Sequence, residues 1–339
     1  MNDKKLKRLP IKEYSGFCLS KCCTPVVKRK HYFLVTDIAI TGDAPKDLIR
    51  LYSYEKGIHR SKSNWELYIV KHGHKHYPNE SITEYLLNRI GEVLEFDMSV
   101  SKLGLIGSQI RFFSKYFLKK PDVQILNHGA ELYAGFINDK NLIEEIEQQK
   151  LSADLFTIQF TENTINNFFP ENASVIFRKF LEMLLFDAIV GNNDRHFYNW
   201  GVITDLRGKT APFFAPIYDT ARGLYWNDHD DKLTKMFKFG SQLNQQIEFY
   251  ANKSKPKIGW EGKTKLNHFE LIDLIKDIPL IRDTDTFTKH LTPNKYQNLE
   301  QMISTEFKHL LSPYRIELIL RTLTYRFTGL KKSLNLCHD

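Results

Sequence analysis

Residues 187–199 read DAIVGNNDRHFYN, a stretch that joins the end of an apolar run to a short polar loop. Within it, Asp194, His196 and Asn199 follow the order DRHxxN, so a carboxylate, an imidazole and a carboxamide lie close together along the chain. The preceding run, VIFRKFLEMLLFDAIVG at residues 175–191, places its apolar side chains at helical spacing. The sequence therefore predicts a polar loop held at the carboxyl end of a buried helix.

A second apolar run, APFFAPIYD at residues 211–219, follows this loop and ends in another carboxylate, Asp219. We expect a strand here, which would hold that carboxylate in place. Asp194 could accept the proton of a hydroxyl group, while Asn199 and Asp219 offer the hard oxygen ligands that Mg²⁺ prefers. Phosphoryl transfer needs this equipment and little more. An ordinary turn is the plain alternative, but helix, loop and strand at this spacing favour a phosphotransferase site.

The region from residue 31 to residue 118 is rich in predicted strands. Apolar runs separated by turn residues predict strands at residues 31–40, 47–54, 65–71 and 108–118. A helix at residues 80–94 interrupts them, with Asn79 in position to cap it. This order predicts a small lobe made of a twisted antiparallel sheet with one helix inserted.

Several residues of this lobe are placed to contact a nucleotide. Lys71 ends the predicted strand WELYIVK, from which its ammonium group could reach phosphates. Glu80 and Glu84 lie one turn apart on the following helix, so either could pair with Lys71. If the end of the last strand is the hinge between two lobes, the backbone from Ser114 to Phe117 would hydrogen-bond an adenine edge, with Ser114 and Tyr116 as the candidate contact residues.

The turn TGDAPK at residues 41–46 joins the first two predicted strands. Its backbone N–H groups could hold an anion, and Gly42 would permit a close approach. One glycine is a weaker signal than a glycine-rich loop, and an ordinary β-turn is an equal alternative. Thr41, Gly42 and Lys46 are accordingly candidate phosphate-contacting residues.

Beyond about residue 119 the chain is predicted to be mainly helical. The buried helix would begin after Ser174 and end at Gly191. Further amphipathic helices are predicted at residues 268–278, 295–307 and 313–334. We expect three regions, namely an N-terminal extension of unknown role at 1–30, a nucleotide-binding sheet lobe at 31–118 and a helical lobe at 119–339.

The length suits two packed lobes, because 339 residues are more than usually fold around one hydrophobic core. The hydrophobic content of 42% is that of a folded protein. No stretch approaches the roughly 18 apolar residues that a membrane-spanning helix needs. The basic start is not followed by the apolar run of a secretory signal. We therefore expect a soluble protein that works in the cytoplasm, either of the producing cell or of a host cell.

The formal net charge of +8 would attract polyanions without specifying one. Direct nucleic-acid binding is not expected, because no basic stripe with interleaved aromatic residues is evident. Cys18, Cys22 and Cys23 lack zinc-finger spacing, so thiols without a metal are favoured. The alternating histidines of KHGHKH at residues 71–76 are interpreted as a solvated turn, because Gly73 and a nearby proline accompany them.

Five motifs together resemble those of the HipA-like serine/threonine kinases, the toxin kinases of bacterial HipBA and HipBST modules and their CtkA-like effector relatives. They are TGDAPK, YIVK, the Asn79–Glu80 pair, GNNDRHFYN and PIYD, in family order from about residue 35 to residue 225. The resemblance implies an α+β, bilobal fold like that of protein kinases and phosphoinositide kinases, with a small antiparallel β lobe carrying one helix and a larger, mostly helical lobe. It also implies that ATP and Mg²⁺ bind between the lobes.

Carried over by position, the resemblance makes Asp194 the catalytic residue and Asn199 and Asp219 the metal ligands. His196, inside the same motif, is placed among the cofactor-contacting residues. Known members modify protein serine or threonine, including residues of aminoacyl-tRNA synthetases, and several are restrained by a DNA-binding antitoxin. The resemblance thus implies a toxin or effector kinase whose partners would be a synthetase or a host protein, and an antitoxin.

In the small lobe the resemblance makes Lys71 the ATP-contacting lysine. The family spacing prefers Glu80 to Glu84 as its helix glutamate. Such kinases can phosphorylate themselves on a hydroxyl just before the loop glycine, a place that Thr41 occupies. Some relatives carry a second serine two residues earlier, where this chain has Ala39.

Two other functions remain open on the residues alone. A phosphoinositide-type lipid kinase also uses DRHxxN, although PIYD with Thr220 and Ala221 after it does not match the DFG-like metal motif of that class. The other is a nucleotide-binding interaction protein that has lost activity, against which the intact Asp194, Asn199 and Asp219 argue.

Overall fold

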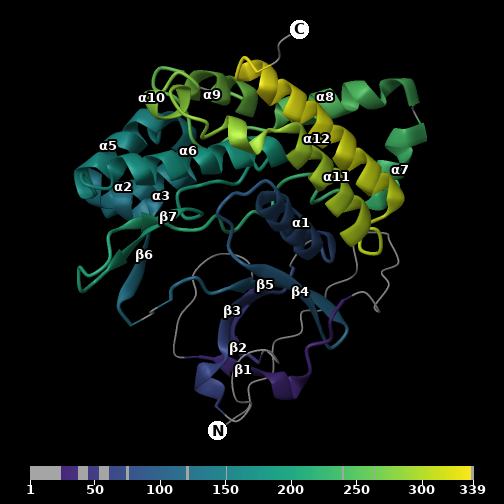
Figure 1. Ribbon diagram of the computed structural model, residues 1–339, viewed down its shortest axis with the longest axis horizontal. Helices are drawn as coiled ribbons and strands as arrows, with labels where there is room; N and C mark the ends of the chain where they lie inside the picture. The colour runs from purple at the N-terminus through teal and green to yellow at the C-terminus, as the bar shows by residue number, and fades with distance from the viewer. Residues whose placement is uncertain are drawn as a thin grey trace.

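The computed structural model describes residues 24–36, 45–52, 61–73, 76–119, 122–149, 151–238, 240–263 and 265–336. Strands dominate the chain up to about residue 119, and helices dominate the rest (Figure 1). The sheet lies at one end of the molecule and the helices gather at the other, with α1 (Asn79–Val93) between them (Figure 1). In the part of the chain that the structure describes, no helix combines the length and the apolar character needed to span a membrane.

The sheet is antiparallel throughout and has the strand order β1-β2-β3-β5-β4. Its strands are β1 (Tyr32–Val35), β2 (Lys46–Leu51), β3 (Glu66–Lys71), β4 (Ser101–Ile106) and β5 (Gln109–Lys115), and short 3₁₀ turns lie at η2 (Arg29–His31) and η3 (Lys62–Asn64). Each of the four predicted strands overlaps an observed strand, but the last prediction was too long, because residues 116–118 lie past the end of β5. β4 was missed, because Gly104 and the polar start of this strand obscure its alternation. It pairs with β5 through the turn at Gly107, whose backbone is left-handed.

Helix α1 covers one face of this sheet. Leu86, Leu87 and Ile90 are buried on it and belong to the same apolar cluster as Leu103 of β4 and Ile110 of β5. The opposite face of the sheet carries its own small cluster, which comprises Tyr32, Ile49, Leu51, Tyr68, Val70 and Phe113. The sheet is therefore packed on both faces, and α1 joins it to the helices.

The start of α1 differs from the prediction. Asn79 lies inside the first turn and not at the cap position, which Pro78 occupies without a side-chain hydrogen bond. The Asn79 carboxamide instead donates to the backbone oxygen of Asp228, 3.0 Å away. The side chain is buried, so it satisfies a backbone group from a distant segment and not the end of its own helix.

The helical part is organised around α6 (Ala173–Val190), which is buried along most of its length. This is the helix predicted from the apolar spacing, and Gly191 ends it in a left-handed conformation, as expected. The predicted helices at 268–278, 295–307 and 313–334 correspond to α9, α11 and α12. The remaining bounds are α2 (Gly129–Ile137), α3 (Lys140–Gln148), α4 (Ser152–Leu155), α5 (Ile158–Phe168), α7 (Asp230–Lys238), η4 (Gly240–Gln242), α8 (Leu243–Lys253), α9 (His268–Ile275), α10 (Pro279–Arg282), η5 (Thr288–His290), α11 (Pro293–Glu306) and α12 (Pro313–Ser333).

A second, three-stranded sheet lies beside the helices, in the order β6 (Gln124–His128), β7 (Gly201–Asp205), β8 (Phe213–Phe214). The prediction of a strand over residues 211–219 was wrong in extent, because β8 has only two residues. Pro212 and Pro216 flank it, and a proline has no N–H group for a strand ladder.

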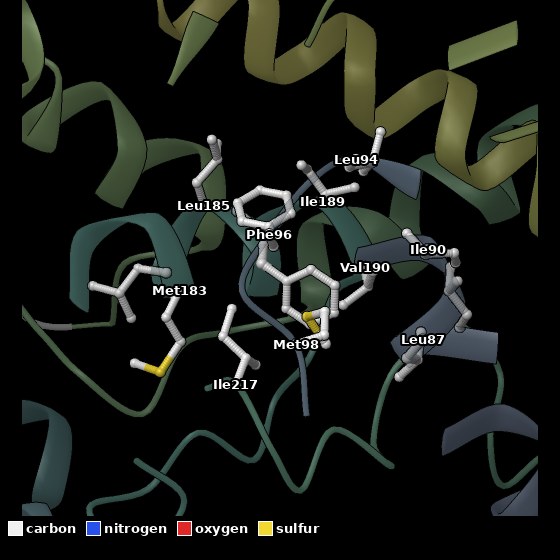
Figure 2. Packing of buried hydrophobic residues seen from close by; sticks show 14 of the residues in the cluster. Leu87, Ile90, Leu94, Phe96, Met98, Met183, Leu185, Ile189, Val190 and Ile217 are labelled. Carbon is white, nitrogen blue, oxygen red and sulfur yellow. The ribbon is translucent and has the colours of Figure 1, made fainter. Parts of the chain in front are cut away.

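Ile217 is held in a different way. Its N–H donates to the Asp97 oxygen at 2.7 Å, and its oxygen accepts from the Ser99 N–H at 3.0 Å. Figure 2 shows Ile217 beside Met98, in the buried cluster that also includes Val190 of α6 and Leu87 of α1. The segment that leads to Asp219 is thus anchored between α1 and α6. The same core continues into the sheet lobe, and the proposed division near residue 118 stays a prediction.

Candidate functional site

The loop after α6 is held by one buried arginine, Arg195. Its guanidinium group binds both carboxylate oxygens of Asp187, with N–O distances of 2.8 and 3.0 Å. The same group donates to the backbone oxygens of Asn199, at 2.6 Å, and Tyr218, at 2.7 Å. One side chain therefore ties together the end of α6, the DRHxxN loop and the residue before Asp219.

This arrangement brings the loop residues into contact. The Asn199 carboxamide donates to the backbone oxygen of Asp194 at 2.9 Å and lies 3.2 Å from the Nε2 atom of His196. Asn192 supports the turn from behind, since its Oδ1 atom accepts from the Asp194 N–H and its Nδ2 atom donates to Asp187. Asp194 keeps its carboxylate at the surface, a quarter exposed.

Asp219 follows Tyr218 in a left-handed backbone conformation, with φ of 54°. Asp tolerates this region better than most residues, since its short side chain can satisfy nearby backbone groups. The turn directs the carboxylate at the sheet lobe, where its Oδ1 atom lies 2.8 Å from the Nζ atom of Lys71. The predicted lysine and the predicted metal ligand, 148 residues apart in sequence, are therefore in direct contact.

Lys71 is shared between two carboxylates, because its Nζ atom also lies 2.5 Å from Oε1 of Glu84. Burial opposes the charge on Lys71, but the two carboxylates outweigh it and raise the pKa of the ammonium group. Burial likewise opposes the charge on Asp219, and the nearby Lys71 and Lys46 hold the pKa of that carboxyl well below its usual range. The Asp219 side chain is thus anionic at neutral pH.

For Glu84, burial outweighs the nearby charges, in contrast to Lys71 and Asp219. Desolvation in its buried position outweighs the attraction of Lys71 and raises the pKa of Glu84 to about 7. The preference for Glu80 as the partner of Lys71 was wrong. Lys71 at the end of β3 meets the second turn of α1, so the side chain one turn beyond Glu80 forms the ion pair. Glu80 lies in the first turn, where a carboxylate complements the helix dipole.

Lys46 is the Cα partner of Lys71 on the neighbouring strand, so both side chains leave the same face of the sheet. Its charge acts on Asp219 and also lowers the pKa of His128, which burial lowers most. A second cation therefore stands near the site, as predicted for the end of the TGDAPK turn. Thr41 and Gly42 lie outside the described residues.

The backbone expected to form the hinge makes hydrogen bonds within the sheet lobe. The Tyr116 N–H donates to the Leu67 oxygen at 2.8 Å, and the Lys115 N–H donates to the Val100 oxygen at 2.7 Å. These two donors therefore hold the sheet together and do not face an adenine edge in this conformation. The Ser114 hydroxyl lies 3.4 Å from that of Ser99. The Tyr116 N–H is therefore already paired, and an adenine contact along the Ser114–Phe117 backbone stays a prediction.

Some residues of the site were not predicted. Arg195 stands inside the DRHxxN motif, but the motif by itself assigns it no role. Tyr218 was noted only as a neighbour of Asp219, yet its hydroxyl lies 2.9 Å from Nδ1 of His128 and donates to the Tyr198 oxygen at 3.2 Å. Arg222, whose Nε atom lies 3.0 Å from Oδ2 of Asp194, carried no motif signal.

The donor set suits a cation that is shared with a ligand. Within the described ranges, no group of three or more His, Cys, Asp or Glu side chains could hold a metal ion by itself. Mg²⁺ commonly takes one or two protein oxygens and completes its shell with phosphates and water. Asn199 and the anionic Asp219 fit that requirement. Of the histidines at 72, 74 and 76, His74 lies outside the described residues, His72 contacts Asp47 and His76 packs edge-on against Trp226.

Comparison with known proteins gives three findings. A family model described as the HipA-like C-terminal domain matches residues 38–276. The serine/threonine-protein kinase CtkA of Helicobacter pylori is 26% identical over 216 residues, which cover 62% of this chain and 62% of that protein, so the match spans less than two thirds of the relative's length. The crystal structure of a Helicobacter pylori proinflammatory kinase, CtkA, is matched with a TM-score of 0.69 at 18% identity, covering 93% of this chain and 99% of that one. This likeness confirms the predicted α+β, kinase-like fold.

Proposed function

We propose, from the premise that this chain belongs to the family of HipA-like C-terminal domains, that it is an ATP-dependent protein serine/threonine kinase. The observation that carries the proposal is the contact of Lys71 with Asp219 beside the loop of Asp194 and Asn199. A cation for phosphates, two oxygen ligands for Mg²⁺ and a surface carboxylate are the groups that phosphoryl transfer requires. The name of the relative CtkA supports the choice of serine or threonine as acceptor.

Each residue has a proposed part in this reaction. Lys71 and Lys46 would hold the nucleotide phosphates, while Asn199 and Asp219 would hold Mg²⁺. Mg²⁺ held by these two residues would supply positive charge to offset that of the phosphates. Asp194 would accept the proton of the acceptor hydroxyl, or orient that hydroxyl for attack. Glu84 and Arg195 would not touch the substrate but would keep Lys71 and the loop in position.

The test is incubation of the purified chain with labelled ATP and Mg²⁺, followed by mass spectrometry for phosphate, with Thr41 as the first site to inspect. Wild-type protein should incorporate label. Asp194→Asn should lose most of the turnover while binding MgATP normally, because it removes only the proton acceptor. Asp219→Asn should weaken MgATP binding as well, because it removes a metal ligand. Undiminished turnover in both variants would contradict these assignments.

The same experiment separates the alternatives. Nucleotide binding without label transfer under varied metals would favour an inactive nucleotide-binding interaction protein. Transfer to phosphoinositide vesicles and not to protein would favour a lipid kinase. We further propose that the kinase is a toxin or effector whose protein substrate is an aminoacyl-tRNA synthetase or a host protein. A toxin would in addition bind an antitoxin. Identification of labelled proteins in a lysate tests the substrate class.

A further inference from the structure

Arg222 forms an ion pair with Asp194, the carboxylate that accepts the proton in the proposed reaction. Its Nε atom lies 3.0 Å from Oδ2 of Asp194, and its side chain is 46% exposed. The guanidinium carbon lies 5.1 Å from the ring centroid of Trp226, which supports the group by a cation–π contact. In the described part of the chain, the two terminal nitrogens of Arg222 have no hydrogen-bond acceptor. The four N–H groups on these two nitrogens are therefore available to a ligand beside Asp194.

The backbone fixes this placement. The Asn193 N–H donates to the Arg222 oxygen at 3.3 Å, so the segment after Asp219 runs alongside the catalytic loop. Gly223 makes the approach possible, because a Cβ atom there would lie only 2.7 Å from the backbone oxygen of Val190. Arg222 is thus held next to Asp194 by the fold itself and not by its side chain alone.

The geometry points to a substrate-contacting role, which rests on the proposed kinase function. A hydroxyl that gives its proton to Asp194 must lie about 2.6–3.2 Å from the carboxylate. The phosphorus that it attacks then lies about 3–3.5 Å beyond that oxygen. A long, half-exposed arginine on the same carboxylate can reach that position by a change of rotamer. We propose that Arg222 is a catalytic residue that binds the phosphoryl group during its transfer.

The chemistry gives this cation a defined task. The bond between the acceptor oxygen and phosphorus forms while the bond from phosphorus to the bridging oxygen of ADP breaks, and ADP leaves with that electron pair. The hydroxyl proton passes to Asp194. Negative charge spreads over the three oxygens of the phosphoryl group, and an arginine supplied from the same chain can stabilise it. The half-exposed ion pair with Asp194 is weak, so the guanidinium group can exchange it for the phosphoryl oxygens.

A binding experiment tests the role without turnover. Calorimetry would compare MgADP alone with MgADP plus aluminium fluoride, which mimics the transferring phosphoryl group. Arg222→Met keeps side-chain length but removes the charge and should bind MgADP within about threefold of wild type, yet lose about 100-fold for the aluminium fluoride complex, as for the loss of one transition-state donor. Arg321→Met is the matched control, because Arg321 is 47% exposed and pairs with Glu317 on α12. It should change neither affinity.

Equal binding of the aluminium fluoride complex by wild type and Arg222→Met would overturn the role of Arg222 while leaving the kinase proposal standing. Failure of the wild type to bind MgADP at all would overturn the kinase proposal and the role of Arg222 with it.

A second measurement uses Arg222→Ala in the label-transfer assay with added guanidinium chloride at low millimolar concentration. Recovery of turnover is expected, because the missing group is supplied in solution, and a merely structural arginine would show none.

Discussion

At the scale of single residues, Glu84 links the small lobe to the site through its ion pair with Lys71. Folding raises the pKa of Glu84 from 4.5 to about 7, so the folded protein holds the proton of this carboxyl more tightly than the unfolded chain does. The resulting stabilisation is fully present below pH 4.5 and is lost as the pH rises through 7. Lys71 and Asp219 do not titrate between pH 5 and 8, because their pKa values move away from this window.

We therefore predict that Glu84→Gln becomes more stable relative to wild type as the pH rises from 5 to 8. At pH 5 the two proteins should have similar free energies of unfolding, because Glu84 is then protonated in the folded state. At pH 8 the variant should gain up to about 3 kcal/mol, since it avoids a buried charge. Urea unfolding at both pH values measures this difference.

Glu80→Gln is the control, one helical turn away and partly exposed. Its free energy of unfolding should differ from wild type by a nearly constant amount over the same range. In the label-transfer assay, Glu84→Gln should also lower turnover more than Glu80→Gln, because it removes the partner of Lys71. A constant difference for Glu84→Gln across pH 5–8 would disprove the assigned pKa.

At the scale of elements, Arg195 connects α6, the DRHxxN loop and the approach to Asp219. We predict that Arg195→Met lowers the free energy of unfolding by about 3–5 kcal/mol, because it leaves the buried carboxylate of Asp187 without a counter-charge. Three segments lose their common hydrogen-bond donor, so MgATP affinity should fall in the same variant. Chemical denaturation and calorimetry measure the two effects.

The control for this prediction is again Arg321→Met, which breaks an exposed ion pair and should cost no more than about 1 kcal/mol. A second control, Asp187→Asn combined with Arg195→Met, removes both charges. It should recover part of the lost stability, because the uncompensated carboxylate is gone. A single variant no less stable than Arg321→Met would show that Arg195 does not hold these segments.

The elements also show what the sequence could predict. Helix α6 and its end at Gly191 could be predicted, because a helix buried on nearly all sides leaves a long, dense apolar run that a glycine ends. The family predicted from the motifs is confirmed by the match to residues 38–276. The strand over residues 211–219 was overestimated, because apolar character alone does not reveal that Ile217 pairs with the segment before β4.

For the site, too, part of the arrangement could be predicted from the sequence and part could not. Motif order alone sufficed to suggest that Lys71 and Asp219 belong to one site, and the structure places them 2.8 Å apart. The choice between Glu80 and Glu84 could not be made from spacing, since both lie on one face of α1. It depends on which helical turn faces the end of β3. The use of the Tyr116 N–H by Leu67 likewise depends on how the chain just after β5 continues along β3, which one sequence does not display.

At the scale of the whole molecule, one apolar core runs from the sheet through α1 into the helices. Leu103 and Ile110 of the sheet, Ile90 of α1 and Ile189 of α6 belong to the same cluster. Figure 2 shows Ile90 and Ile189 in this region, around the segment that carries Phe96 and Met98. Because α1 is packed on both sides, the two lobes cannot separate without exposing this core. We therefore expect the described parts of the chain to unfold together.

Ile90→Ala tests this expectation at the centre of the core. The variant should lose about 2–5 kcal/mol of unfolding free energy, because it removes buried methyl groups and leaves a cavity. Circular dichroism, which follows the helices, and hydrogen exchange of β3 and β5 should shift to the same extent, as a two-state transition requires. Val175→Ala, which truncates an exposed side chain on α6, should change stability by no more than about 0.5 kcal/mol. If the sheet were destabilised while the helices kept their wild-type transition, the lobes would be independent folding units and Lys71 would meet Asp219 only by docking of separately folded parts.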